Sequence, residues 1–255
     1  MRYDDCMIRS IAHPQNLAWH RTHLRRHRRA WFIMAGVFVV AILLAIFGYF
    51  GTVSWATLGN AVFHTTYRLA IAYGIALILG ISIALIVGWS PLADFFFPFF
   101  DILQNIPSFA LIPFFIFFFG MTDQMVIFFA VSSIIWPILF AVLTSIKSAH
   151  KDLSDAATIF GAHGLRRIPF YLAPLSFPAM LTGSIVGIAI GWEAVIGAEI
   201  IVNVSGFGAF IKTASVSGIN QATIAGLLVI LIIVFVVNRM IWAPLLAESA
   251  KRYAE

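Results

Sequence analysis

The chain has 255 residues, of which 61% are hydrophobic and only 11% are charged. A water-soluble domain carries roughly a quarter of charged residues, so the composition excludes a soluble enzyme and indicates the lipid bilayer as the solvent. The formal net charge of +5 would also suit a protein that binds nucleic acid. The positions of the basic residues exclude nucleic acid as a partner, because they follow the pattern of a membrane protein.

Residues 1–29 form a basic arm that precedes the first apolar run. Seven Lys and Arg residues lie in it, and we interpret it as a cytoplasmic segment beside the first membrane span. His20, His23 and His27 have helical spacing, but nothing near them completes a metal site, so we predict no metal. Cys6 is the only cysteine and cannot form an internal disulfide, which is compatible with a reduced cytosolic face.

Six apolar stretches follow, each close to the roughly 20 residues that cross a bilayer. Four are uninterrupted: residues 31–50, 69–88, 125–146 and 222–242. The first is too long for the core of a signal peptide, so we expect it to remain as a span. Two, residues 95–119 and 170–202, contain prolines and polar or acidic residues. Interrupted helices of this kind pack inside a bundle or line a cavity.

The predicted fold is therefore an all-α, polytopic membrane protein with six transmembrane helices. Its membrane domain covers residues 30–246, and residues 247–255 form a C-terminal tail. With the N-terminus in the cytoplasm, fourteen of the 16 Lys and Arg residues fall on the cytoplasmic side. Only Arg68 and Lys212 fall on the extracytoplasmic side. The positive-inside rule thus predicts an inner-membrane protein with both termini in the cytoplasm.

The sequence shows no sign of catalysis or of cofactor binding. It contains no Gly-Lys dipeptide, so it has no P-loop for a nucleotide, and it lacks the His-Glu-x-x-His and Gly-x-Ser-x-Gly motifs. We expect a chain that is not an enzyme and holds no cofactor of its own.

One long cytoplasmic loop, residues 148–168, has an amphipathic pattern. Leu153, Ala156, Ala157 and Phe160 recur on one side and Asp152 and Asp155 on the other, which predicts a short helix that Gly161 ends. Its apolar side has two interpretations: docking into the groove of a partner, or packing on the chain's own bundle or the membrane interface.

The same loop resembles a known motif. Asp155-Ala156-Ala157, then Gly161, then Pro174 at the opening of the next span, resembles the Glu-Ala-Ala loop of ATP-binding-cassette importer permeases. Asp155 replaces the family's glutamate, and Ala173 replaces the leucine before the proline.

Three further segments are similar to permeases of the nitrate, sulfonate and taurine uptake subfamily. They are Asn105 to Pro113 with Phe119-Gly120, Trp192 to Glu199, and Ser205-Gly206-Phe207-Gly208. The resemblance covers about residues 54–246 and implies the fold of a type I importer permease.

The resemblance also implies the partners. A second copy of the chain would complete the pore, two cytoplasmic ATP-binding subunits would hold ATP and Mg²⁺, and an extracytoplasmic binding protein would deliver the substrate. The segment from Asp155 to Gly161 would be the coupling helix, seated in the ATPase subunit.

Polar residues within the spans are candidates for the translocation path, because an idle intramembrane charge is costly. Asp101, Gln104 and Asn105 are spaced to share one helix face. Trp192 and Glu199 also share a face, with Glu193 about 100° away. Glu199 is either part of the path or its outer gate, or a structural residue paired with Arg68 or Lys212. Arg68 is either a charge that steers an anion or an interfacial charge at a helix end.

Gly183, Gly187 and Gly191 recur every four residues, which predicts a seam of close helix packing. The alternative class is a secondary transporter or channel that works without an ATPase. Such a protein would show inverted repeats and intramembrane ion ligands, and it would have no use for a docking loop. The substrate suggested by the resemblance is a small anion or organic solute such as nitrate, a sulfonate or taurine.

Overall fold

The structure is a computed structural model that describes residues 54–91, 93–218 and 220–253. These residues form helices and connecting turns, and no strand occurs among them. The helices are, in chain order, α3 (Trp55–Trp89), α4 (Ala93–Gln104), η1 (Ser108–Leu111), α5 (Ile112–Phe119), α6 (Asp123–Lys147), α7 (Lys151–Ile159), η2 (Gly164–Arg166), η3 (Ile168–Leu172), α8 (Ala173–Val202), α9 (Phe207–Val216), α10 (Asn220–Val237), η4 (Asn238–Trp242) and α11 (Ala243–Tyr253).

Four of the described helical segments are long and apolar enough to cross a membrane. They are Trp55–Trp89, Asp123–Lys147, Gly164–Val202 and Ala222–Ser249. A fifth candidate is the pair Ala93–Gln104 and Ser108–Phe119, which is bent by 83°. The predicted span at residues 31–50 and the predicted basic arm lie outside the described residues. The described part is thus an all-helical, polytopic membrane protein with four or five spans.

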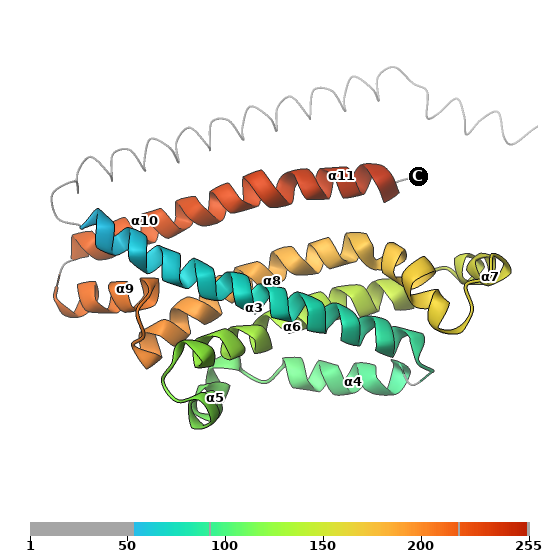
Figure 1. Cartoon of the computed structure of the whole chain (residues 1–255), viewed down its shortest axis with the longest axis horizontal. Helices are drawn as coiled ribbons and strands as arrows, with labels where there is room; N and C mark the ends of the chain where they lie inside the picture. Colours follow the sequence, from blue (N-terminus) through green and yellow to red (C-terminus); the bar gives the residue numbers. More distant parts are fainter. Residues whose placement is uncertain (1–53, 92, 219, 254–255) are drawn as a thin grey trace, which may run out of the picture. The chain divides into compact units, whose positions relative to one another are not determined.

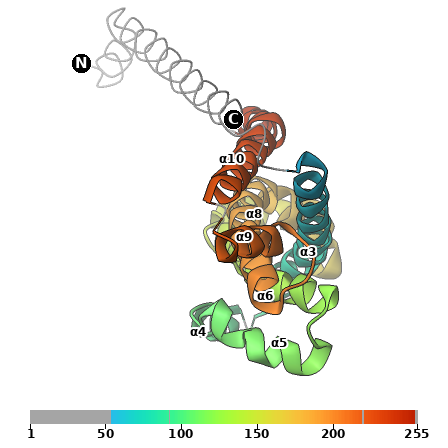
Figure 2. The same cartoon turned by 90° about the vertical axis from the view of Figure 1, so that its left-hand side faces the viewer.

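Helix α6 lies between α3 and α8 and packs closely on both. Helices α3 and α6 run in the same direction, because residue numbers increase along both in their contact: Gly80 lies against Ile138, and Gly88 lies against Ile146. Helix α8 runs in the opposite direction to α6, because residue numbers increase along α8 as they decrease along α6: Gly183 lies against Pro137, and Gly191 lies against Ile134. Helices α3 and α6 are therefore parallel and α8 is antiparallel to both, as alternating membrane spans require. Figures 1 and 2 show α4 and α5 on one side of these three helices and α10 and α11 on the other.

The three glycines of the predicted seam all lie in the contact between α8 and its neighbours. A Cβ atom on Gly183 would lie 2.7 Å from the carbonyl oxygen of Pro137 and 2.9 Å from the Cα of Ile138. A Cβ on Gly187 would lie 3.1 Å from Ile134 Cγ2, and one on Gly191 would lie 2.7 Å from a methyl of Leu69. Only glycine allows these backbones to approach so closely.

Several helices extend beyond the predicted boundaries. Helix α3 begins at Trp55, well before the uncharged run that starts at residue 69, because Arg68 is buried inside the helix bundle instead of marking a helix end. Helix α9 begins within the segment Ser205-Gly206-Phe207-Gly208 and continues to Val216, in a region for which no helix was predicted. The last helical stretch runs through α11 to Tyr253, past the predicted boundary at residues 246 and 247.

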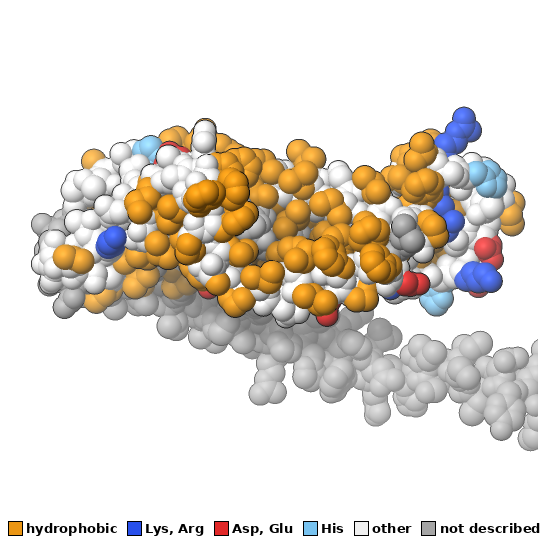
Figure 3. Space-filling model, turned by 90° about the horizontal axis from the view of Figure 1, so that it is seen from below, with side chains coloured by type: hydrophobic (Ala, Val, Ile, Leu, Met, Phe, Trp, Pro, Cys, Tyr) orange, Lys and Arg blue, Asp and Glu red, His pale blue; other side chains and the backbone are white. Residues whose placement is uncertain are grey.

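The surface agrees with a membrane setting. On the face seen in Figure 3, hydrophobic side chains cover the region between the two ends, and charged side chains gather at the end where Figure 1 places α7. The described chain departs from long apolar helices at the break between α4 and α5, at the loop that carries α7, and at the turn and short helix α9 that follow α8.

The glycine seam gives the first prediction. Gly183→Ala should lower the apparent melting temperature of the purified protein in detergent by several degrees, because its new methyl group would meet backbone atoms that cannot move aside; overpacking of this kind costs about 1–3 kcal/mol. Gly74→Ala is the matched control, since nothing lies within 4 Å of its Cβ position. Equal melting temperatures for the two variants would contradict the close packing of α6 and α8.

Candidate functional site

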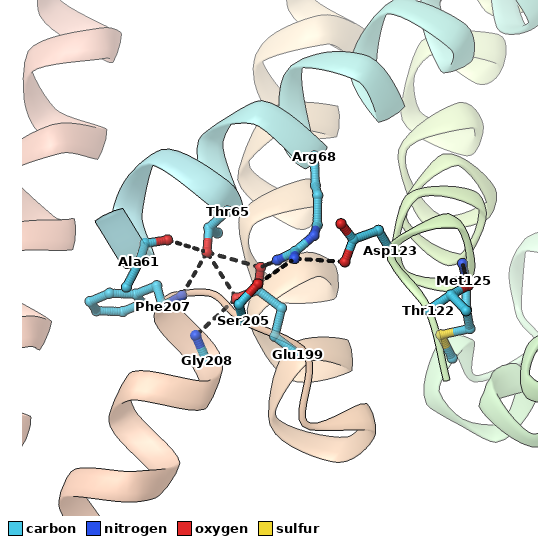
Figure 4. Close-up of polar contacts among 10 residues, drawn as sticks. All are labelled: Ala61, Thr65, Arg68, Thr122, Asp123, Met125, Glu199, Ser205, Phe207 and Gly208. Atoms are coloured by element: carbon cyan, nitrogen blue, oxygen red, sulfur yellow. Dashed lines mark hydrogen bonds and ion pairs between the residues drawn. The ribbon is translucent and has the colours of Figure 1, made fainter. Parts of the chain in front are cut away.

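The most extensive polar site in the described part is an ion pair enclosed between α3 and α8. Arg68 of α3 and Glu199 of α8 are both fully buried, and Arg68 Nη1 lies 2.5 Å from Glu199 Oε1. Figure 4 shows the two side chains meeting between the helices. A buried charge is tolerated only when it is paired and its remaining hydrogen-bonding positions are filled.

Two further groups bind the Glu199 carboxylate, and a third supports one of them. The Thr65 hydroxyl lies 2.9 and 2.8 Å from its two oxygens, and the backbone N–H of Gly208 donates to Oε2 at 2.9 Å. Thr65 Oγ1 in turn accepts a hydrogen bond of 2.8 Å from the backbone N–H of Phe207. The carboxylate therefore lies at the first turn of α9, where unpaired N–H groups favour a negative charge.

The turn between α8 and α9 has the shape that this contact needs. Helix α8 ends because Asn203 adopts the left-handed conformation at φ 59°, with its N–H bonded to the carbonyl of Glu199. A Cβ atom on Gly208 would lie 2.7 Å from the Cβ of Glu199, so a glycine is required for its N–H to reach the carboxylate.

A second carboxylate reaches Arg68 from α6. Asp123 is the first residue of that helix, and its Oδ1 lies 2.8 Å from Arg68 Nη2. The side chain of Asp123 is 59% exposed, in contrast to that of Glu199. The cluster of Arg68, Glu199 and Asp123 thus carries one positive and two negative charges and ties together α3, α6 and α8.

This geometry decides the question left open for Arg68. Its guanidinium is neither an exposed charge that could steer an anion nor an interfacial charge at a helix end, because it is buried and bound to two carboxylates. Of the two candidate partners for Glu199, Arg68 is the one that binds it. Lys212 instead donates to the carbonyl of Ile200 at 2.9 Å, near the C-terminus of α8.

Thr65, Asp123 and Gly208 were not predicted as members of this site. Arg68 and Glu199 could be found because charges within apolar segments stand out, whereas a threonine, a helix-capping aspartate and a turn glycine have ordinary structural roles at every such position. The one available signal was the pairing of Thr65 with Arg68, three residues apart on one helix face.

Trp192 and Glu193 lie on different sides of α8, as the helical spacing predicts. Trp192 is buried and Glu193 is exposed, and the Glu193 carboxylate forms no hydrogen bond or ion pair with the described residues. Glu193 lies two residues after Gly191, which packs on Ile134. Ile134 is eleven residues into α6 and α8 runs antiparallel to it, so Glu193 lies about 13 Å from the start of α6, well inside the span.

The break between α4 and α5 presents the other predicted path residues together. Gln104 donates to Asp101 Oδ1 at 2.7 Å, and Asn105 donates to the carbonyl of Asp101 at 2.6 Å. All three side chains are exposed. Phe100 contacts Trp136 in the middle of α6, so Asp101 lies level with the middle of that helix. The role of these residues, and of Glu193, in a path stays a prediction.

The predicted amphipathic helix of the loop is α7, and its end is well defined. Gly161 adopts φ +88°, its N–H donates to the carbonyl of Thr158, and the N–H of Ala162 donates to the carbonyl of Ala157. This pair of bonds is the Schellman arrangement, which requires a residue in the left-handed conformation. The guanidinium of Arg167 also donates to Ser154, which ties α7 to the segment that leads into α8.

The apolar side of α7 is uncovered by the described residues. Phe160 is 89% exposed, Ile159 83%, Phe170 75% and Leu165 70%. We call these four residues the α7 surface. Beside it lies a hollow of about 630 Å³ that Ala157 and Gly161 help to line. Asp155 is exposed and Ala156 half-buried, and Pro174 lies at the start of α8, where its missing N–H does no harm.

These features define the class of the protein: a polytopic helical membrane protein with a buried ionic cluster at one end and an uncovered amphipathic helix at the other. The chain belongs to the family described as "Binding-protein-dependent transport system inner membrane component", whose model matches residues 76–242. It is thus a transport component and not an enzyme, and this decides against a secondary transporter or channel.

Curated relatives agree with the family. The chain is 28% identical to the taurine transport system permease protein TauC of Escherichia coli, over 72% of this chain and 67% of that protein. It is 26% identical to the nitrate import permease protein NrtB of Leptolyngbya laminosa, over 68% of this chain and 63% of that protein. It is also 23% identical to the putative aliphatic sulfonates transport permease protein SsuC of Bacillus subtilis, over 82% and 83%. The matched stretch spans about two thirds of the first two relatives.

The ionic cluster gives the second prediction. Glu199→Gln should destabilise the protein by about 3–5 kcal/mol, because it leaves the buried Arg68 without its enclosed partner. Asp123→Asn removes an exposed partner of the same arginine and should cost at most about 1 kcal/mol. Thermal unfolding in detergent measures both. The double variant Arg68→Met with Glu199→Gln should recover part of the loss; equal effects of the two single variants would show that burial of Glu199 is not what makes the pair important.

Proposed function

We propose that this chain is the permease subunit of an ATP-driven importer, and that it couples a substrate path to ATP hydrolysis in a partner subunit. The observation that carries the proposal is the α7 surface: four large apolar side chains lie exposed at the end of α7 and on the segment that leads from it into α8. An apolar helix face that neither lipid nor its own bundle covers is typical of a helix that docks into a groove.

The proposed assembly has two copies of the chain, two cytoplasmic ATP-binding subunits and an extracytoplasmic binding protein. ATP and Mg²⁺ would be held by the ATP-binding subunits. The count of six spans, with residues 31–50 as the first and both termini in the cytoplasm, belongs to the same proposal. It is supported by the alternation of α3, α6 and α8 and by the distribution of basic residues.

Motion could pass from α7 to the spans through a short rigid connection. The Schellman end at Gly161 and the bond between Arg167 and Ser154 hold α7 to the segment that becomes α8. Helix α8 is in turn packed on α6 along the glycine seam. When ATP binding moves the grooves of the ATP-binding subunits that hold α7, the spans attached to α7 would tilt as rigid bodies.

We further propose that Gln104, Asn105 and Glu193 line the translocation path, which Trp192 and Glu199 would support from within the bundle. An exposed carboxylate well inside a span cannot face hydrocarbon without a cost of about 3 kcal/mol or more, so the exposed side of α8 at Glu193 would face water or a second copy. The transported substrate would be a small anion or organic solute, such as nitrate, a sulfonate or taurine, as the names of the relatives suggest.

The third prediction tests docking. Ala157→Arg places a charge beside the hollow at α7, and Gly161→Pro cannot adopt the left-handed conformation found there, so both should abolish co-purification of the ATP-binding subunit. Asp152→Asn, on the exposed opposite side of α7, is the control and should co-purify normally. Normal co-purification of both test variants would refute the docking role.

The fourth prediction tests the path. In a Cys6→Ser background, a cysteine at Glu193 should react with a membrane-impermeant thiol reagent, because this side of α8 faces water. A cysteine at Ile78, which is 67% exposed on apolar α3, should react at least tenfold more slowly, since it faces lipid. Equal, slow labelling of the two positions would place Glu193 outside the path.

A further inference from the structure

A second hollow, of about 280 Å³, lies between the first turns of α3 and α9. Its floor is formed by small or apolar residues: Ala61, Gly206 and Ala209. Its rim carries polar side chains that can donate or accept hydrogen bonds: Thr57, Asn60, His64 and Thr213. We call it the α3–α9 hollow.

The hollow lies at the opposite end of the spans from α7. Helices α3 and α6 are parallel, and α3 begins about ten residues before the level at which α6 begins, whereas α7 follows the end of α6. If α7 faces the cytoplasm, as the proposed function requires, the α3–α9 hollow opens on the extracytoplasmic side. The further inference rests on the proposed function in this respect.

The buried ionic cluster fixes the shape of the hollow. Gly206 on its floor directly precedes Phe207, whose N–H bonds to Thr65, and Gly208, whose N–H bonds to Glu199. Arg68 also reaches Ser205, another lining residue, at 3.5 Å. A recess held open by buried hydrogen bonds is preorganised, so a partner does not have to order it on binding.

The lining excludes two other occupants. No lysine or arginine lines the hollow, and the two cations nearest in sequence, Arg68 and Lys212, are engaged by carboxylates and by the carbonyl of Ile200. An anionic solute would therefore find no countercharge. Thr57 and Thr213 already donate to Ser54 and to the carbonyl of Ala209, but acyl chains of lipid would leave the side chains of Asn60 and His64 without hydrogen-bond partners, at a cost for each group.

We propose that the α3–α9 hollow is a docking socket for the binding protein that the family description names, and that it receives an apolar side chain from a loop of that protein. A protein interface commonly has an apolar centre surrounded by polar, hydrogen-bonding side chains, and the α3–α9 hollow has the same arrangement. A preformed recess of this size holds one large side chain, and such anchors carry much of the binding energy.

The test uses the permease with its ATP-binding subunit in lipid vesicles, to which the transporter's own purified binding protein is added. Ala209→Trp fills the hollow from its floor, and Thr57→Arg places a bulky charge on its exposed rim. In both variants the binding-protein concentration that half-maximally stimulates ATP hydrolysis should rise about tenfold or more. Ser215→Trp is the control, because Ser215 is exposed on α9 and does not line the hollow.

Stimulation of both test variants at the concentration that suffices for Ser215→Trp would overturn the proposal. Should Ala209→Trp fail to fold, Thr57→Arg alone decides, since its side chain is exposed. Failure of the proposed function would look different: the unaltered chain would not co-purify with an ATP-binding subunit, whereas failure of the socket leaves that co-purification intact.

Discussion

The buried pair of Arg68 and Glu199 constrains one whole end of the described structure. Two charges removed from water need hydrogen-bond partners within the protein, so the Thr65 hydroxyl and the Gly208 N–H of α9 lie against the carboxylate. This requirement sets where α8 ends, why a glycine follows at position 208, and how α9 lies against α3. Replacement by an apolar pair would remove the charges, but it would also remove the bonds that orient the turn.

Packing of backbone against backbone constrains the centre. The contacts at Gly183, Gly187 and Gly191 leave no room for a side chain, so α6 and α8 can move only together or by sliding along each other. The break between α4 and α5 and the helices α10 and α11 lie on either side of this packed centre (Figure 2). Rigid-body movement of α3, α6 and α8 is therefore the motion that the packing permits.

The two ends of the bundle differ in chemistry, as a protein that links two aqueous compartments requires. At one end, Arg68 and Glu199 are enclosed, and no Lys, Arg, Asp or Glu lines the α3–α9 hollow. At the other, charged side chains surround an exposed apolar helix face (Figure 3). In the proposed assembly each end has a partner: a soluble binding protein at the first and an ATP-binding subunit at the second.

Composition by itself determined the class of the fold and the approximate positions of α3, α6, α8 and α10, because burial in lipid demands long apolar helices. Periodicity determined the amphipathic helix before Gly161 and the spacing of the α8 glycines, because close helix packing demands small residues at regular intervals. Tertiary structure alone decided that Arg68 lies within a helix and not at its end, that Glu199 binds it instead of Lys212, and that Asp123 and Thr65 join them. These choices depend on which side chains distant in sequence become neighbours, and a local pattern of residues carries no record of such contacts.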